Sequence, residues 1–271
     1  MTKKIEILYS SLLPLKVVTF NEIVEQATKI IDGSASRKYI YDKYVSRLIK
    51  TGRIEAIRKG LFLVVSPTEQ EKKYELDKLL IASKIRKEYY LGFHTALEYY
   101  GSAYSAFNEA YVCTKKRNSF APFKYRRFTF KQVAVKDTTS HVFERPYGRN
   151  VLKVSSKERT FIECVDRPQY VGGWEECIKS LENLSGIDAE QLISLTLKQE
   201  GKSLPSRVGY VLELLKNNSP FYEHINDSML NEIETKIRDP PQYLISGQKS
   251  TLNRRWNLCI PEGFDEKLRG I

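Results

Sequence analysis

The pattern of apolar and polar positions between residues 19 and 65 predicts two helices followed by a short β-hairpin. From Thr19 to Ile31, apolar residues recur every three or four positions, which is the spacing of one helix face. Thr19 and Glu22 have the Thr-x-x-Glu spacing of a capping box, in which each side chain accepts a hydrogen bond from the backbone N–H of the other residue. Asp32-Gly33-Ser34 then interrupts the pattern and predicts the end of this helix.

A second amphipathic pattern runs from Arg37 to Lys50 and predicts another helix, which Ser34 or Ser36 can cap. Gly52 follows directly and is a typical stop signal. The apolar face of this helix is expected to consist of Ile40, Tyr41, Tyr44, Val45 and Leu48. The opposite face is polar and cationic and carries Lys38, Tyr39, Lys43, Ser46, Arg47 and Lys50.

Two runs rich in β-forming residues, Ile54 to Arg58 and Leu61 to Val65, predict strands that meet at Lys59-Gly60. Helix, turn, basic helix and hairpin is the order of a winged helix-turn-helix, whose second helix enters the major groove of DNA. On this interpretation Arg58 and Lys59 would contact the flanking phosphates. The alternative is a small helical domain whose basic face is merely solvated.

The remaining chain predicts a second, α+β domain, because strands come first, helices follow and a strand closes the chain. Ser66-Pro67-Thr68 ends the hairpin and suggests a boundary, which divides the chain into residues 1–68 and residues 69–271. Over the whole chain, further helices are expected at 3–13 in the N-terminal domain and at 69–87, 89–101, 156–165, 174–184, 188–201 and 203–215. Strands are expected at 110–114, 133–143, 150–154 and 256–260.

The stretch from Lys115 to Lys131 combines basic and aromatic residues and contains no acidic residue. In one interpretation the cations neutralise phosphates while the aromatic rings stack on unpaired bases. In the other, the aromatic residues form the buried face of a strand, and its basic outer face is available to RNA or to an acidic protein. The cations of the candidate surface are Lys115, Lys116, Arg117, Lys124, Arg126 and Arg127. The interleaved rings are Phe120, Phe123, Tyr125, Phe128 and Phe130.

The charge of the chain narrows the choice of partners. It carries 44 Lys and Arg against 33 Asp and Glu, a net charge of +11, which favours an anionic partner and nucleic acid over a membrane surface. Residues 1–70 hold 12 Lys and Arg against 7 Asp and Glu, so both halves share the basic excess. No apolar run is long enough to span a membrane, and the N-terminus lacks a signal-peptide core, so we expect a cytosolic protein.

Sequence signatures of an active site or a cofactor are missing. The chain has no phosphate-binding Gly-x-x-x-x-Gly-Lys loop, no Gly-x-Gly-x-x-Gly and no Gly-x-Ser-x-Gly elbow. We expect His94, within an aromatic helical segment, to be a packed residue and not a catalyst. The cysteines have neither Cys-x-x-Cys spacing nor a nearby His, so reduced, mostly buried thiols are expected. They are Cys113, Cys164, Cys177 and Cys259.

Three carboxylates on or beside one predicted helix leave a nuclease as an alternative. Glu158, Glu163 and Asp166 could in principle hold a metal ion. Glu158 is, however, better explained by a capping box with Ser155. We therefore expect no enzymatic activity, no cofactor and no metal site.

Short segments spread over most of the chain carry a resemblance to a known family. They are Lys59-Gly60-Leu61-Phe62, Phe93-His94-Thr95-Ala96-Leu97 with Gly101, Val154-Ser155-Ser156-Lys157-Glu158-Arg159-Thr160, Asp166-Arg167-Pro168, Gly172-Gly173, Arg207-Val208-Gly209-Tyr210-Val211-Leu212-Glu213 and Trp256-Asn257-Leu258. In this order the chain resembles the AbiEi-type antitoxins of type IV toxin–antitoxin systems, which are transcriptional regulators of viral defence by abortive infection.

The resemblance implies an N-terminal domain that binds inverted repeats of double-stranded DNA in its own promoter and represses the operon. It implies a C-terminal domain that neutralises a nucleotidyltransferase-like toxin without forming a stable complex with it. A second hypothesis is a stand-alone winged-helix regulator whose C-terminal domain binds a ligand or dimerises. The metal-dependent nuclease is the third.

Overall fold

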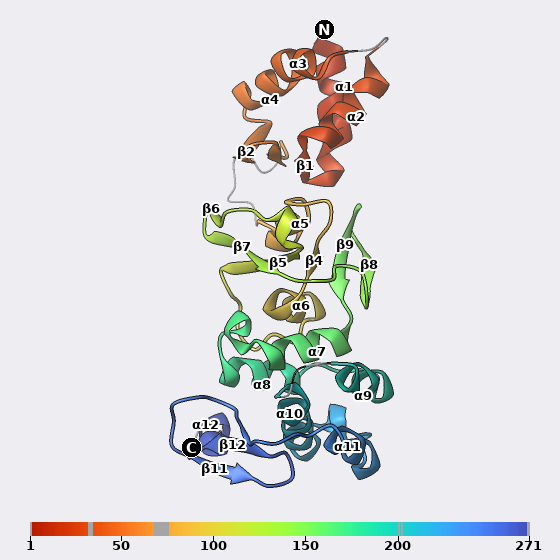
Figure 1. Ribbon diagram of the computed structural model, residues 1–271. Coiled ribbons are helices and arrows are strands. Elements are labelled where there is room, and N and C mark those ends of the chain that lie inside the picture. The colour runs from red at the N-terminus through yellow and green to blue at the C-terminus, as the bar shows by residue number, and fades with distance from the viewer. Residues whose placement is uncertain (1, 32–34, 68–75, 200, 202, 270–271) are drawn as a thin grey trace.

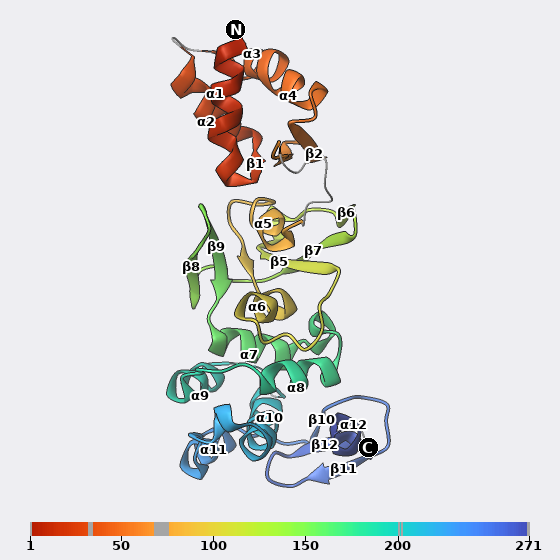
Figure 2. The same ribbon diagram turned by 180° about the vertical axis from the view of Figure 1, so that it is seen from behind.

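The computed structural model describes residues 2–31, 35–67, 76–199, 201 and 203–269. These residues form three tiers stacked along one long axis, with the N-terminal unit at one end and the C-terminal helices at the other (Figure 1, Figure 2). Within the described residues the strands form three sheets, with helices in every tier. The predicted α+β fold class is confirmed.

The N-terminal unit packs its helices on a three-stranded antiparallel sheet of order β1-β3-β2. Thr19 caps the second helix through the predicted capping box with Glu22. At the hairpin turn, Gly60 has a φ of 78°, a value that suits glycine. The elements are α1 (Thr2–Leu12), β1 (Val17–Thr19), α2 (Phe20–Ile30), α3 (Arg37–Ile40), the π-helical turn η2 (Tyr41–Val45), α4 (Ser46–Lys50), β2 (Ile54–Arg58) and β3 (Leu61–Val64).

Two features of this unit differ from the sequence expectation. Strand β1 is too short to show an alternating pattern, and only its pairing with β3, with Val17 opposite Leu63, makes it a strand. Tyr41 was expected in the core but is 43% exposed, with its ring centroid 5.8 Å from that of Phe20. The reason is the π-helical turn that begins at Tyr41, because the 3.6-residue spacing does not hold there. The predicted break at Asp32-Gly33-Ser34 lies outside the described residues.

The central tier is a six-stranded mixed sheet of order β6-β7-β5-β4-β9-β8. Its two faces are covered by different helices, with α5 on one and α6 and α7 on the other (Figure 1). The strands are β4 (Tyr90–Leu91), β5 (Glu109–Thr114), β6 (Phe123–Tyr125), β7 (Phe128–Ala134), β8 (Val142–Tyr147) and β9 (Asn150–Ser155). The helices are α5 (Lys78–Ser83), α6 (Phe93–Tyr100) and α7 (Lys157–Asp166).

Three expectations for this tier need correction. The helix expected at 89–101 begins only at Phe93, because Tyr90–Leu91 pair with β5 and β9 as strand β4. The strand expected at 133–143 is wrong, since β7 ends at Ala134 and β8 begins at Val142. Between them the Asp137 carboxylate accepts hydrogen bonds from the backbone N–H of Thr139 (2.9 Å) and Ser140 (3.0 Å), which stabilises a turn. In place of the helix expected at 69–87, the structure has the short α5, which ends at Ser83. Residues 69–75 of the expected helix lie outside the described part of the chain.

The third tier consists of helices and a small sheet of order β10-β12-β11. The strand expected from Trp256 begins at Leu258; Trp256 itself is buried, and its indole N–H donates to Glu213 at 2.6 Å. The helices are α8 (Trp174–Glu182), α9 (Ala189–Leu197), α10 (Leu204–Asn218), α11 (Asp227–Glu234) and α12 (Phe264–Arg269). The strands are β10 (Gln242–Tyr243), β11 (Ser250–Asn253) and β12 (Leu258–Pro261).

The hairpin of the N-terminal unit shares an apolar core with the central tier. Ile57, Leu61 and Leu63 belong to the same buried cluster as residues of α5, β5 and β9. Polar contacts reinforce the junction: Tyr125 donates from its hydroxyl to Glu55 at 2.7 Å. The cluster therefore spans the boundary that the sequence places at residue 68.

Candidate functional site

The α3–η2–α4 helix presents one cationic face to solvent. Ser36 caps its first turn by accepting a hydrogen bond from the backbone N–H of Tyr39 at 3.1 Å. The opposite side of the helix is held in the core by Ile40, Tyr44, Val45 and Leu48. On the outer side the structure brings together the predicted residues Lys38, Tyr39, Lys43, Arg47 and Lys50, all exposed, and Ser46, which is half-buried. This face lies at the N-terminal end of the molecule (Figure 1).

The two cations of the hairpin have different surroundings. Lys59 is exposed at the turn and lines a groove beneath the N-terminal unit together with Arg37, the first residue of α3. Arg58 is half-buried, and its guanidinium lies 4.6 Å from the ring centroid of Phe123 and 5.9 Å from that of Phe120. A cation over aromatic rings is a stabilising contact. Arg58 thus helps to join the hairpin to the central tier.

The basic and aromatic stretch is divided between core and surface. Phe120, Tyr125, Phe128 and Phe130 are buried, so the prediction that these rings stack on bases is wrong. The reason is that the rings fill the space between the sheet and the N-terminal hairpin. The alternative of a buried aromatic face with a basic outer face is confirmed. The exposed cations are Lys116, Arg117, Lys124, Arg126 and Arg127, and Lys115 is half-buried.

Two of these cations, Arg117 and Arg126, form ion pairs at the surface. Arg117 lies 3.3 Å from Glu88, and Arg126 lies 2.6 Å from Glu55 on strand β2. The second pair connects the outer face of the stretch to the N-terminal unit. Exposed ion pairs contribute little stability, so both guanidinium groups remain accessible to a competing anion.

The three carboxylates of the nuclease hypothesis do not converge. Glu158 accepts a hydrogen bond from the backbone N–H of Asp188 at 3.0 Å, Glu163 is paired with Arg159, and Asp166 lies 3.6 Å from Arg167. Throughout the described ranges, no three His, Cys, Asp or Glu side chains are placed to hold a metal ion. Glu158 and Glu163 are buried and make separate structural contacts, and Asp166 is exposed.

The predicted capping box of Ser155 and Glu158 is also wrong. Ser155 ends strand β9, and it is Ser156 that caps α7 by accepting from the backbone N–H of Arg159 at 3.1 Å. The helix begins one residue later than expected, so Glu158 no longer has the position of a capping-box partner. Its carboxylate instead reaches the start of α9, where it binds the N–H of the capping residue Asp188.

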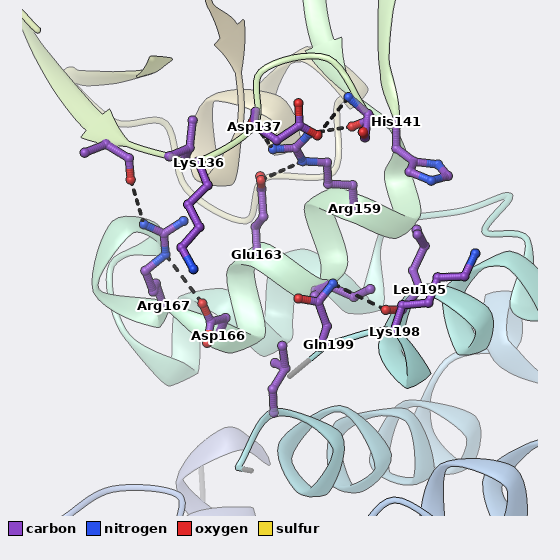
Figure 3. A pocket seen from close by; sticks show the side chains of 15 residues that line it. Lys136, Asp137, His141, Arg159, Glu163, Asp166, Arg167, Leu195, Lys198 and Gln199 are labelled. Atoms are coloured by element: carbon purple, nitrogen blue, oxygen red, sulfur yellow. Dashed lines mark hydrogen bonds and ion pairs between the residues drawn. The ribbon is translucent and has the colours of Figure 1, made fainter. Parts of the chain in front are cut away.

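A buried polar network, which no sequence motif predicted, ties α7 to strand β4, and Figure 3 shows its Arg159–Glu163 contact. Arg159 donates from Nε to Glu163 at 2.8 Å and from Nη2 to the hydroxyl of Tyr90 at 2.7 Å. Tyr90 in turn donates its hydroxyl proton to Glu163. Burial raises the pKa of Glu163, although the adjacent guanidinium opposes this effect. The one signal in the sequence was the i, i+4 spacing of Arg159 and Glu163.

His94 is a packed residue, as expected. Its ring is fully buried and stacks on Phe107 with 3.7 Å between centroids. Its Nδ1 and Nε2 atoms lie 3.5 Å from Glu98 and 3.4 Å from Glu176. Burial lowers the pKa of His94, and the two carboxylates oppose this shift. Because Glu98 also accepts from the N–H of Phe107, at 3.0 Å, the cluster holds the loop after α6 in place.

The thiols agree with the expectation from the sequence. All four cysteines are unpaired, and Cys113, Cys164 and Cys177 are buried. Burial raises the pKa of each of these three thiols, which disfavours the reactive thiolate form. In the part of the chain that the structure describes, no helix has the length and apolar character needed to cross a membrane.

Comparisons with known proteins give a likeness in structure. No family model matches the chain, and no curated protein matches it. The fold is similar to that of the crystal structure of the RV2827C protein from Mycobacterium tuberculosis, with a TM-score of 0.62. The two share a fold. The likeness covers 95% of this chain and 91% of that chain at 14% sequence identity, and at this identity it concerns the fold alone.

Proposed function

We propose that this protein is a DNA-binding antitoxin of a type IV toxin–antitoxin system. It binds inverted repeats in its own promoter through an N-terminal winged helix-turn-helix, and it neutralises a nucleotidyltransferase-like toxin through the rest of the chain. The order of α1, β1, α2, the α3–η2–α4 helix, β2 and β3 supports a winged helix. The exposed cationic face of the α3–η2–α4 helix is the observation that carries the proposal.

The composition of this face suits a DNA groove. A single helix fits the major groove, where polar side chains read base edges and cations contact phosphates on both sides. Tyr39 and Ser46 are suited to base edges, and Lys38, Lys43 and Lys50 to phosphates. Arg47 can serve either role, since a guanidinium binds guanine in a bidentate manner. The hairpin residue Lys59 would add a contact next to the start of the helix.

The DNA-binding part is tested with full-length variants and a duplex that carries the inverted repeats upstream of the gene. The double variant Lys43→Ala with Arg47→Ala is expected to weaken operator binding about tenfold to a hundredfold at physiological salt, because two charge-assisted contacts are lost. The matched control is Lys236→Ala with Arg238→Ala, which removes the same two charges from exposed positions far from the helix. Equal binding by both double variants would contradict the proposal.

The antitoxin part rests on the family resemblance and on the basic outer face of residues 115–127. Its test is growth rescue when the adjacent nucleotidyltransferase-like gene is expressed. The wild-type chain is expected to restore growth, and so is the variant Lys43→Ala with Arg47→Ala, if neutralisation does not require DNA. The double variant Lys116→Ala with Lys124→Ala tests whether the basic outer face takes part in neutralising the toxin. Failure of the wild-type chain to rescue growth, with the toxin active, would leave a DNA-binding regulator only.

A further inference from the structure

A pocket of about 730 Å³ opens where the loop between β7 and β8, helix α7, and the adjoining ends of α9 and α10 meet (Figure 3). It has no part in the proposed DNA interface, which lies at the other end of the molecule. Its volume is that of a typical small-molecule site. Ile162, Leu195 and Leu204 give it an apolar lining, and charged side chains surround this lining.

The acidic groups at the pocket are already occupied by contacts within the chain. Asp137 accepts from the backbone N–H groups of Thr139 and Ser140 and from the hydroxyl of Thr139 at 2.7 Å. Glu163 accepts from Arg159 and Tyr90 through Oε1, while its buried Oε2 makes no hydrogen bond. Asp166 lies 3.6 Å from the Nε of Arg167. The carboxylates therefore offer little to a cation that enters.

The two lysines at the pocket, in contrast, lack acceptors, whereas Arg159 donates to Glu163, to Tyr90 and to backbone carbonyls. Lys136 and Lys198 are exposed, and neither has an ion-pair partner among the residues that the structure describes. The Nε of Arg167 is buried without a hydrogen bond, because Asp166 is 3.6 Å away, and the Nη1 of the same guanidinium donates to the carbonyl of Ala134 at 3.5 Å. In Figure 3, Lys136 reaches down beside Arg167 on one side of the pocket, and Lys198 lies on the opposite side. A buried donor without an acceptor is costly, and a bound anion would supply the acceptor.

We propose that this pocket binds a phosphate-bearing small molecule of nucleotide size, with its phosphates between Lys136 and Arg167 and its base against Ile162, Leu195 and Leu204. A lone inorganic anion would fill only a small part of the volume and leave the apolar lining in contact with water. A polyphosphate attached to a planar, largely apolar body matches both the charge and the size. The same phosphate chemistry can come from a free nucleotide or from the 5′ end of a nucleic acid.

The site would also connect three segments that lie far apart along the chain. Lys136 belongs to the loop after β7, Arg167 follows α7, and Lys198 follows α9. A ligand that bridges these segments would hold the central tier against the C-terminal helices. Ligand binding should therefore raise the thermal stability of the full chain as well as give a binding signal.

The test is a calorimetric titration of the full-length protein with ATP, together with thermal unfolding in the presence and absence of ATP. ATP is expected to bind and to raise the unfolding temperature, and adenosine and inorganic phosphate alone to bind at least tenfold more weakly. Lys136→Ala is expected to weaken ATP binding about fivefold to tenfold, because it removes one charge-assisted contact, and Lys198→Ala, on the opposite side of the pocket, to weaken it less. Lys236→Ala, another exposed lysine outside the pocket, is the matched control.

Several outcomes would overturn the inference. They are the absence of binding to ATP at millimolar concentration, binding that neither pocket variant changes, and binding of adenosine as tight as that of ATP. A parallel titration with a 5′-phosphorylated tetranucleotide distinguishes a free nucleotide from a nucleic-acid end as the source of the phosphate. The ligand that binds more tightly, and loses affinity in Lys136→Ala, supports the phosphate site and identifies its source. Operator binding is measured separately, so failure here leaves the proposed repressor untouched.

Discussion

At the scale of single residues, buried polar side chains hold the tiers of this molecule together. Glu163 joins α7 to Tyr90 on β4, and Glu158 reaches from α7 to the start of α9. His94 lies between Glu98 and Glu176 under the loop that follows α6. In a low-dielectric interior such contacts are strong when they are satisfied and costly when they are broken. Their protonation should therefore be visible in the stability of the whole chain.

Protonation of His94 is expected to destabilise the fold in mild acid. Because burial lowers the pKa of His94 in the folded chain, the unfolded chain binds a proton there at pH values where the folded chain does not. The free energy of unfolding should fall as the pH drops below about 6.5, the ordinary pKa of His. Urea unfolding between about pH 7.5 and 5.5 measures this, and the fall should be smaller in His94→Gln than in wild type.

The control for this experiment is His224→Gln, because His224 is exposed. Its pH dependence should match that of the wild-type chain. An equally steep loss of stability in His94→Gln and wild type would show that other groups, and not His94, account for the acid sensitivity.

Gly209 is expected to be intolerant of any side chain. It lies in α10 directly against Trp256, and a Cβ at this position would come within 2.0 Å of the indole Cζ3. The large buried ring cannot move without disturbing its hydrogen bond to Glu213. Gly209→Ala should lower the free energy of unfolding by about 2 kcal/mol or more, as overpacking outweighs the gain in helix propensity.

Chemical denaturation measures this change, with Gly201→Ala as the matched control. At Gly201 the nearest atom to an added Cβ is 3.8 Å away, so the change should be small. If Gly209→Ala proved as stable as the wild-type chain, Trp256 would have to pack differently from the arrangement described.

At the scale of elements, the α3–η2–α4 helix combines a sequence-encoded pattern with one local irregularity. Its capping residue, buried face and cationic face all follow from the order of residues between Ser36 and Lys50. The π-helical turn beginning at Tyr41 changes which side chains face outward and leaves Tyr41 in solvent. Its ring lies edge-on to that of Phe20 at the start of α2.

The salt dependence of operator binding should report how many phosphates this helix contacts. Each contact releases condensed counterions, and the logarithm of the affinity falls with the logarithm of salt concentration by about 0.9 per contact. Replacing Lys43 and Lys50 together by Ala should flatten this slope by about 2. Binding measured from low to physiological salt tests it. An unchanged slope in the double variant would remove both lysines from the phosphate contacts.

At the scale of the whole molecule, the apolar cluster between the N-terminal hairpin and the central sheet makes the two units depend on each other. Ile57, Leu61 and Leu63 would leave a buried surface exposed if the N-terminal unit were removed. A fragment comprising residues 76–271 should therefore unfold at a lower temperature than the full chain and should bind a hydrophobic dye in its native state. Thermal unfolding with such a dye makes the comparison.

A milder change at the same junction gives a control. Glu55→Ala removes the acceptor for Tyr125 and the ion-pair partner of Arg126 but leaves the apolar cluster in place. It should lower the unfolding temperature less than the deletion does. A fragment as stable as the full chain, without dye binding, would show that the units fold independently.

Local sequence patterns determined the fold class, most helices and the composition of the cationic helix. The capping box of Thr19, the turn at Gly60 and the amphipathic helix from Arg37 depend on neighbours within a few residues, so the chain encodes them directly. The alternation of aromatic and basic residues within the 115–131 stretch is also local, but only packing against the N-terminal hairpin decides that the rings are buried.

Contacts between distant residues decided what the sequence patterns left open or predicted wrongly. Strand β1 exists because β3 pairs with it, Glu158 binds the N–H of Asp188 thirty positions away, and Lys136, Arg167 and Lys198 line one pocket. In each case the partner is far along the chain, and no periodicity or motif in the sequence reveals which distant residues will be in contact. The sequence therefore determined which residues could form helices, strands and a cationic face, and the tertiary structure alone decided which charged groups meet.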